Sequence, residues 1–198
     1  MDPTERTVAD LAGGIAAERV APAGGTALAV SGAMGAALCE MCCVHSAGDV
    51  PDRDAERLAD CRAALERHRV TLLALADQDA AVVDELFGSG SGESTARDRK
   101  RAATVPFTVA ETTLEVLRLA ETVVDLGRGA VVADAETGIC LTESAFRGSL
   151  ATARRSLAWL DDPDFGADLR ERLDALEAAA ADLDLPCDRA DRHGRSST

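Results

Sequence analysis

The sequence predicts an all-α fold, a multihelical bundle in which long antiparallel helices surround a buried helix of small residues. Apolar residues recur at helical spacing along much of the 198-residue chain, and no stretch alternates apolar with polar residues for more than a few positions. Aromatic residues form only 3% of the chain and Tyr is absent. The core must therefore be packed from Ala, Leu and Val, whose small size suits helices that approach closely.

The first helix is expected to begin near Thr7, because Thr7 and Asp10 have the spacing of a capping box. Val8 and Ile15 then share one face of that helix. We expect the helix to end around Arg19.

The next segment, residues 20–39, carries no charge, and its length matches that of a membrane-spanning helix. Pro22, Gly24 and Gly25 interrupt its first part, and the remainder consists largely of Ala, Gly, Ser and Cys. We therefore interpret it as a central helix of a globular protein, buried on all sides and capped by Thr26. The turn before it is either an ordinary tight turn or a cradle of backbone amides for an anionic or polar ligand.

Residues 52–86 follow a heptad pattern, which predicts one long helix. Asp79 falls on its apolar stripe, in register with Leu58, Leu65, Leu72 and Leu86. A buried carboxylate is costly and is kept where it has a charged partner or a chemical task, so a salt bridge to an arginine and a catalytic role both remain open. Asp77 lies about 200° around the helix axis from Asp79, so the two cannot face the same neighbour.

Serines and glycines in residues 88–92 predict a flexible link, after which Ser94 can cap a helix that ends at Gly127. Pro106 must bend that helix, a feature often found beside a functional cavity. Asp134 is expected to be the N-cap of a helix that runs to about Leu160. A last amphipathic helix follows, so residues 1–185 form one domain and residues 186–198 a disordered tail.

The charge balance limits the partners of the chain. It carries 21 Lys and Arg residues against 35 Asp and Glu residues, a net charge of −14, with Lys100 as the single lysine. So acidic a surface repels phosphate backbones and anionic lipids, which excludes nucleic acid and membrane surfaces as partners. The basic cluster around Lys100 is either a solvated helix start or a contact for a carboxylate-rich ligand tail.

The six cysteines are expected to be reduced thiols that serve as small apolar residues, because no secretory leader is recognisable. This composition favours a cytoplasmic protein. Cys39, Cys42, Cys43 and His45 share helical spacing, but a second cluster of ligands with matching spacing is missing, so we predict no metal site. Glu143 and Arg147 have the spacing of a surface ion pair.

Four segments in order carry a resemblance. They are a helix, glycine turn and small-residue helix at residues 8–38, the segment LADQDAAVVDEL at 75–86, a proline-containing helix at 103–121, and VVADAETGICLTESAFRGSL at 131–150. In this order they resemble the formiminotransferase-cyclodeaminase C-terminal family, which includes methenyltetrahydrofolate cyclohydrolases. The resemblance extends from residue 7 to about residue 176.

The resemblance implies a dimeric helical enzyme that acts on folate one-carbon units without metal or redox cofactor. It implies catalytic roles for Asp79, Asp77 and Asp134. It also implies substrate-binding roles for Gly24, Gly25 and Thr26, which match the family's glycine-rich loop. We add Pro22, Arg147 and, for the glutamyl tail, Lys100 of the basic cluster to this substrate-binding set. A carboxylate suits this chemistry, because it can stabilise the amidinium carbon or take a proton from the attacking water.

Three functions follow from this resemblance. The preferred one is hydrolysis of 5,10-methenyltetrahydrofolate to 10-formyltetrahydrofolate, and the first alternative is a formimidoyltetrahydrofolate cyclodeaminase that releases ammonia. The second alternative is a non-catalytic helical folate-binding or scaffold protein. It is kept because the chain departs from the family pattern at Ala23 and Thr26 in the glycine turn, at Ala133, and at Thr152 and Ser156, where the family has asparagines.

Overall fold

The computed structural model describes residues 7–88, 94–183 and 185. Within these ranges the chain is helical with no strand, which confirms the predicted all-α class. The predicted disordered tail and most of the predicted flexible link lie outside the described residues. The elements are α1 (Val8–Ile15), α2 (Gly24–Ser46), α3 (Asp52–Phe87), α4 (Ala96–Leu126), α5 (Val131–Ser156), the 3-10 helix η2 (Leu157–Trp159) and α6 (Pro163–Ala181).

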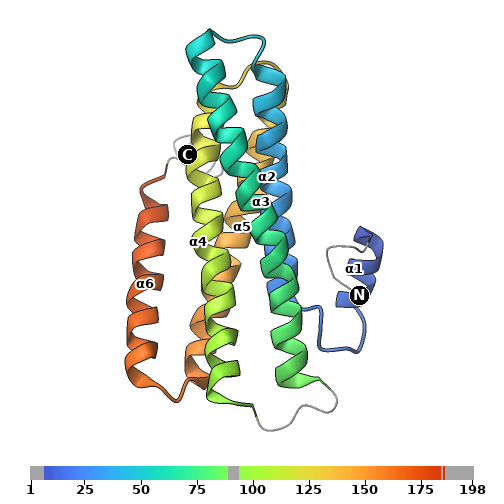
Figure 1. Cartoon of the computed structure of the whole chain (residues 1–198), viewed down its shortest axis with the longest axis vertical. Helices are drawn as coiled ribbons and strands as arrows, with labels where there is room; N and C mark the ends of the chain where they lie inside the picture. Colours follow the sequence, from blue (N-terminus) through green and yellow to red (C-terminus); the bar gives the residue numbers. More distant parts are fainter. Residues whose placement is uncertain (1–6, 89–93, 184, 186–198) are drawn as a thin grey trace, which may run out of the picture.

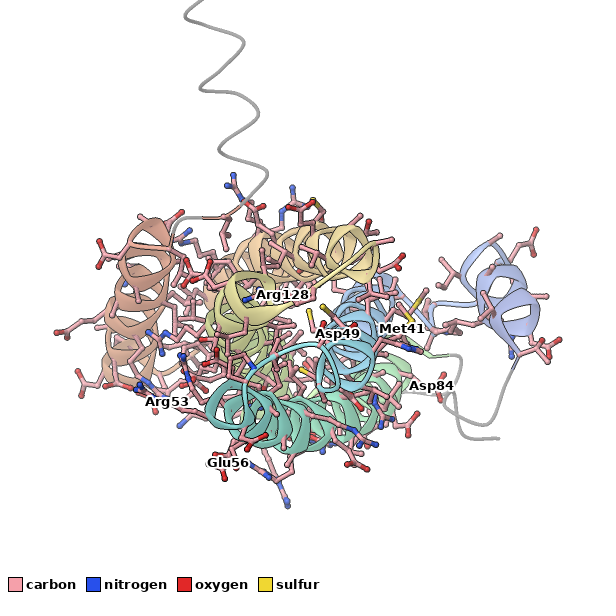
Figure 2. The ribbon with its side chains drawn as sticks, turned by 90° about the horizontal axis from the view of Figure 1, so that it is seen from above. Met41, Asp49, Arg53, Glu56, Asp84 and Arg128 are labelled. Carbon is pink, nitrogen blue, oxygen red and sulfur yellow. The ribbon has the colours of Figure 1, made fainter. Side chains whose placement is uncertain are left out.

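Helices α2 to α5 form an antiparallel bundle in which α2 and α4 each pack against both α3 and α5. In this arrangement α3 and α5 occupy opposite corners. Helix α6 lies on the outer side of α4 and α5, whereas α1 stands apart from the bundle (Figure 1, Figure 2). The long antiparallel helices predicted from the sequence are therefore present.

Close packing of α2 depends on its small residues. A Cβ atom at Gly35 would lie 2.2 Å from Oγ1 of Thr142 and 2.5 Å from the carbonyl oxygen of Gly138 on α5. At Gly32 it would lie 2.9 Å from Cγ2 of Thr113 on α4. Such distances leave no space for a side chain, so these glycines set the separation of α2 from its neighbours.

The heptad stripe of α3 is confirmed. Leu58, Leu65 and Leu72 are fully buried, and Asp79 continues the stripe with only 7% of its surface exposed. The stripe packs onto α2 and α4, which places a carboxyl group inside the bundle at the level where α2 begins.

One helix end and one helix start differ from the prediction. The capping box of Thr7 and Asp10 is present, but α1 already ends at Ile15. Thr95, rather than Ser94, caps α4 and forms a capping box with Asp98.

Helix α5 also begins earlier than predicted, at Val131, so Asp134 is its fourth residue and not its N-cap. Asp134 is exposed. The N-cap is Ala130, whose side chain cannot cap a helix. The sequence therefore did not reveal where α5 begins.

The prediction that α2 is buried on all sides is wrong. One face packs against α3 and α5, but the opposite face leaves Met34 51% exposed and Val44 48% exposed. By length and composition α2 is the one described helix that could cross a membrane, although 44% of its apolar window is buried inside the protein. A core helix passes the same test, and the packing of α2 fits that description.

The cysteines follow the expectation in part. Cys39, Cys42, Cys43 and Cys61 are free and buried, as predicted for small apolar residues. Cys140 is disulfide-bonded, so the expectation of six reduced thiols does not hold for it. The residues around Cys140 in the sequence could not predict this bond, because disulfide pairing depends on the distance between two Cβ atoms in the fold.

Replacing Gly35 tests the close approach of α2 and α5. We expect Gly35→Ala to lower the free energy of unfolding by about 1–3 kcal/mol, because the added methyl group must push the helices apart. Gly24→Ala is the matched control on the same helix, since a Cβ at Gly24 meets nothing within 4 Å. Denaturant unfolding followed by circular dichroism measures both, and equal stability of the two variants would contradict the packing argument.

Candidate functional site

The carboxyl group of Asp79 lies against the N-terminus of α2. Oγ1 of Thr26 donates a hydrogen bond of 2.8 Å to Oδ2 of Asp79. A Cβ atom at Gly25 would lie only 2.1 Å from Oδ1 and 2.5 Å from Cγ of the same carboxyl group. The carboxyl group therefore occupies the place that any side chain at position 25 would fill, and only glycine fits there.

The sequence around Gly25 explains why a carboxyl group from another helix lies at this point. The N-cap of α2 is Ala23, which has an extended backbone and no side chain able to cap. The first amides of a helix lack partners inside it, and the backbone of Thr26, its third residue, hydrogen-bonds to Asp79. Thr26 is therefore not the cap predicted from the sequence, because Asp79 takes that role from α3.

Burial decides the protonation behaviour of Asp79. Removal from water raises the pKa of this carboxyl group above its usual range, and the hydrogen bonds from the side chain and backbone of Thr26 offset only part of the increase. Within the described chain no Lys, Arg or His forms an ion pair with it. The structural salt bridge to an arginine, one of the two possibilities left open by the sequence, is not formed with any arginine of the described residues.

Helix contacts place two further residues at the level of Asp79. Gly32 faces Thr113 on α4, and Leu28 packs against Gly148 on α5. One heptad from Thr113 along α4, toward its start, is Pro106, which is buried inside that helix. One turn beyond Gly148 is Thr152, whose Oγ1 donates to the Gly148 carbonyl at 2.9 Å. The predicted bend position and one of the two altered asparagine positions thus lie at the level of the carboxyl group.

The other residues of the predicted glycine turn and motif surround this point. Pro22 is buried, follows a cis peptide bond and lies beside Gly14, where a Cβ atom would be 3.3 Å from its Cδ. Gly24 is exposed and borders open space. Asp77 is half-buried and lies two residues before Asp79 on α3, so it faces a different direction.

Asp134 lies at the other end of α2. The carbonyl of its neighbour Ala135 accepts a weak hydrogen bond of 3.9 Å from Sγ of Cys39. Cys39 is thirteen residues beyond Thr26, a distance of about 20 Å along the helix. We predicted that the glycine turn, Asp79 and the start of the Asp134 helix lie together. Within one chain they do not.

Arg147 and Lys100 also lie away from Asp79. Arg147 pairs with Glu143 at 2.5 Å and lines a cavity of about 630 Å³ between α4, α5 and α6, which Asp79 does not line. Nζ of Lys100 lies 2.7 Å from Oδ2 of Asp162 and 4.8 Å from the ring centroid of Phe165. Lys100 thus contacts the N-cap residue of α6, and Arg147 forms an ion pair along its own helix. The substrate contacts of both residues remain predictions.

Metal chemistry has no evident donor set in the described part of the chain, where no group of three or more His, Cys, Asp or Glu residues could hold an ion. Burial raises the pKa of Cys39 and of Cys43 to about 12. Thiols of this kind stay protonated at neutral pH and do not act as ligands without a strong ion to displace the proton.

Comparison with known proteins adds to this geometry. The family model described as formiminotransferase-cyclodeaminase matches residues 7–175. The chain belongs to this family. The methenyltetrahydrofolate cyclohydrolase of Methylorubrum extorquens is 29% identical over 192 residues, covering 89% of this chain and 91% of that protein.

A solved structure has the same fold. The crystal structure of formiminotetrahydrofolate cyclodeaminase from Thermotoga maritima matches with a TM-score of 0.79 and 23% identity, over 90% of this chain and 91% of that one. The formiminotransferase-cyclodeaminase helical fold thus accounts for nearly the whole of the described chain.

The ionisation of Asp79 predicts a pH-dependent stability. Because its pKa is raised in the folded state, the folded protein binds more protons than the unfolded chain. The Asp79 contribution is therefore fully favourable below the unfolded pKa and is lost as pH rises through the folded pKa. We expect Asp79→Asn to gain stability relative to the natural protein as pH rises through this window, measured by denaturant unfolding at several pH values. A difference that is constant with pH, or of opposite slope, would contradict burial as the dominant effect.

Proposed function

We propose that this member of the family is a methenyltetrahydrofolate cyclohydrolase, which adds water to the bridging carbon of 5,10-methenyltetrahydrofolate and forms 10-formyltetrahydrofolate. The observation that carries the proposal is the buried carboxyl group of Asp79, held by Thr26 against the first amides of α2. The relative from Methylorubrum extorquens, named as such a cyclohydrolase, supports the choice of reaction.

The chemistry needs a group that stabilises the cationic substrate and takes a proton from the attacking water. The substrate carbon is part of a delocalised cation between two nitrogens, and a water molecule attacks it to give a neutral carbinolamine with release of one proton. An ionised Asp79 accepts that proton, and its raised pKa makes it a stronger base than an ordinary aspartate. The partial positive charge at the N-terminus of α2 favours the attacking oxygen.

The second step opens the ring. The bond from the former methenyl carbon to N5 breaks as N5 gains a proton from Asp79. The hydroxyl group becomes the formyl carbonyl as its own proton passes to the Asp79 carboxylate and from there to solvent. A carboxyl group that has just accepted a proton can return it to N5, so one residue serves both steps. Gly24, which borders open space beside the carboxyl group, leaves room for the substrate to approach.

A formimino substrate presents a related carbon to the same carboxyl group, so ammonia release is the nearest alternative outcome. The name of the Thermotoga maritima structure is the reason to include it. Three measurements on the purified protein separate the possibilities: methenyl absorbance reports hydrolysis, an ammonia electrode reports deamination, and calorimetry reports binding. Binding without either reaction would instead support a folate-binding or scaffold protein.

Removal of the proton-accepting group tests the proposal directly. We expect Asp79→Asn to lower kcat about 10²–10⁴-fold, because the amide cannot accept a proton from water. Asp60→Asn is the control, since Asp60 is exposed near the other end of α3. Hydrolysis is followed as loss of methenyl absorbance above the buffer rate, and a fully active Asp79→Asn variant would rule out this role.

The position of the carboxyl group gives a second test. Gly25→Ala places a methyl group on the Asp79 carboxyl group and must displace it, so we expect kcat to fall at least about tenfold. Gly48→Ala, just beyond the other end of α2, meets no atom within 4 Å and should retain most activity. Far-UV circular dichroism checks that both variants are folded, and similar kcat values for the two would contradict a positioned carboxyl group.

We also propose that two copies of the chain pair through the exposed face of α2. The face contains Val30, Met34, Ala37, Met41 and Val44 and carries no charge in a chain whose net charge is −14. Contact through an uncharged stripe avoids the repulsion that other surfaces of an acidic protein would produce. Met41 points to the side of the bundle on which α1 stands apart (Figure 2).

In such a dimer, Asp134 of one subunit can lie near Asp79 of the other. Met34 lies midway between Thr26 and Cys42, and Cys42 is close enough to Asp134 for its pKa to respond to it. A two-fold axis near Met34 therefore brings Asp134 of the partner subunit toward Asp79.

A charge in the stripe tests the pairing. We expect Met34→Glu to convert a dimer to a monomer in light scattering after size exclusion, because two carboxylates would meet at the axis. Val70→Glu, at an exposed apolar position on α3, is the control and should leave the mass unchanged. A monomeric natural protein, or equal masses for both variants, would contradict this interface.

A further inference from the structure

Two exposed aromatic rings meet at the end of the bundle that contains Asp79. Phe87 is the last residue of α3, and Trp159 is the last residue of η2. Each is 50% exposed, yet their ring centroids lie 5.6 Å apart at an interplanar angle of 70°. Neither residue belongs to the apolar core. In a chain with only four Phe and one Trp, an aromatic pair kept at the surface is not explained by packing.

The position of the pair follows from the lengths of the helices. Helix α2 lies between α3 and α5 and begins at Gly24, whereas α3 and α5 continue beyond that level (Figure 1). From Asp79 to Phe87 is eight residues, about 12 Å along α3. From Thr152 to Trp159 is seven residues along α5 and η2. The two rings therefore meet beyond the level at which α2 begins, about two helical turns from the carboxyl group.

We propose that Phe87 and Trp159 form a platform on which the p-aminobenzoyl ring of a folate stacks while its one-carbon unit faces Asp79. The inference rests on the proposed function. In a folate the reacting carbon is bonded to N10, and N10 carries the aminobenzoyl ring. With the carbon at Asp79, the aminobenzoyl group can therefore extend from the carboxyl group toward the end of the bundle where the two rings meet. Exposed aromatic faces bind planar rings by stacking without needing polar partners.

The polar groups nearby fit this mode of binding. Hydroxyl groups of Thr152 and Ser156 donate to carbonyls of their own helix, to Gly148 and Thr152 respectively, so they offer little to a ligand. Arg99 pairs with Asp161, two residues after Trp159, at 2.6 Å. Its Nε is buried without a hydrogen-bond partner among the described residues. A guanidinium group near the platform can meet the carboxylates that extend from an aminobenzoyl ring.

Trp159 offers a direct readout, because it is the single tryptophan and gives a single indole N–H signal in a ¹⁵N–¹H spectrum. We expect p-aminobenzoylglutamate, titrated into the full-length protein, to shift this signal to saturation, and Phe87→Leu to weaken that binding several-fold. Pterin-6-carboxylate, which lacks the benzoyl ring, should shift it far less. No shift with either probe, or a larger shift with the pterin, would overturn the proposal. A signal that moves with protein concentration alone would also overturn it, because it marks contact between copies.

Kinetics provide an independent test in which a positioning role differs from a structural one. With methenyltetrahydrofolate we expect Trp159→Leu to raise KM on the order of tenfold with kcat changed less than about threefold, and Trp159→Phe to recover most of the loss. Val70→Ala, at an exposed site on α3, is the control. Equal losses in Trp159→Leu and Trp159→Phe, or a loss confined to kcat, would overturn the platform.

The two tests also separate this inference from the proposed function. If the protein binds p-aminobenzoylglutamate at Trp159 but turns over no folate, the cyclohydrolase assignment fails and the platform stands. If it hydrolyses methenyltetrahydrofolate with Trp159→Leu unimpaired, the platform fails and the assignment stands.

Discussion

The desolvated carboxyl group at the start of α2 is the constraint on which the rest of the site depends. A helix whose N-cap is an alanine leaves its first amides without partners, and Asp79 from α3 supplies the missing acceptor. Gly25 makes this possible because it leaves room for the carboxyl group against the backbone. One contact thus has two effects. The Asp79 carboxyl group caps α2, and because the same contact keeps it away from water, it becomes more basic.

The bundle supports that contact by fixing the distance between helices. Glycines at positions 32 and 35 let α2 approach α4 and α5 closely, while the leucine stripe of α3 sets the rotation that turns Asp79 inward. The position of α2 relative to α3 thus determines whether Thr26 reaches the carboxyl group. Small residues in a core are therefore required here for chemistry as well as for packing.

Sequence reasoning found the features that depend on periodicity. The heptad of α3 predicted the burial of Asp79, and the charge-free segment predicted a helix that packs in the bundle. It failed where the outcome depends on a neighbour in space. Thr26 looked like a cap because it follows a glycine turn, yet its hydroxyl donates to another helix. Asp134 looked like a cap because Asp is a favoured N-cap residue, although α5 begins at Val131 and Asp134 is already its fourth residue. Phe87 and Trp159 lie 72 residues apart, and no local pattern could join them.

The most direct test compares the titration of the Asp79 carboxyl group with the acid limb of the pH profile of kcat/KM. Carbon-13 detection of the side-chain carboxyl gives the first, and methenyl hydrolysis gives the second. The account predicts that the two apparent pKa values agree, lie above the ordinary aspartate value of 3.8, and both rise in Thr26→Val, which removes a hydrogen bond that favours the ionised form. An acid limb that stays in place while the Asp79 titration moves would contradict the claim that this carboxyl group controls turnover.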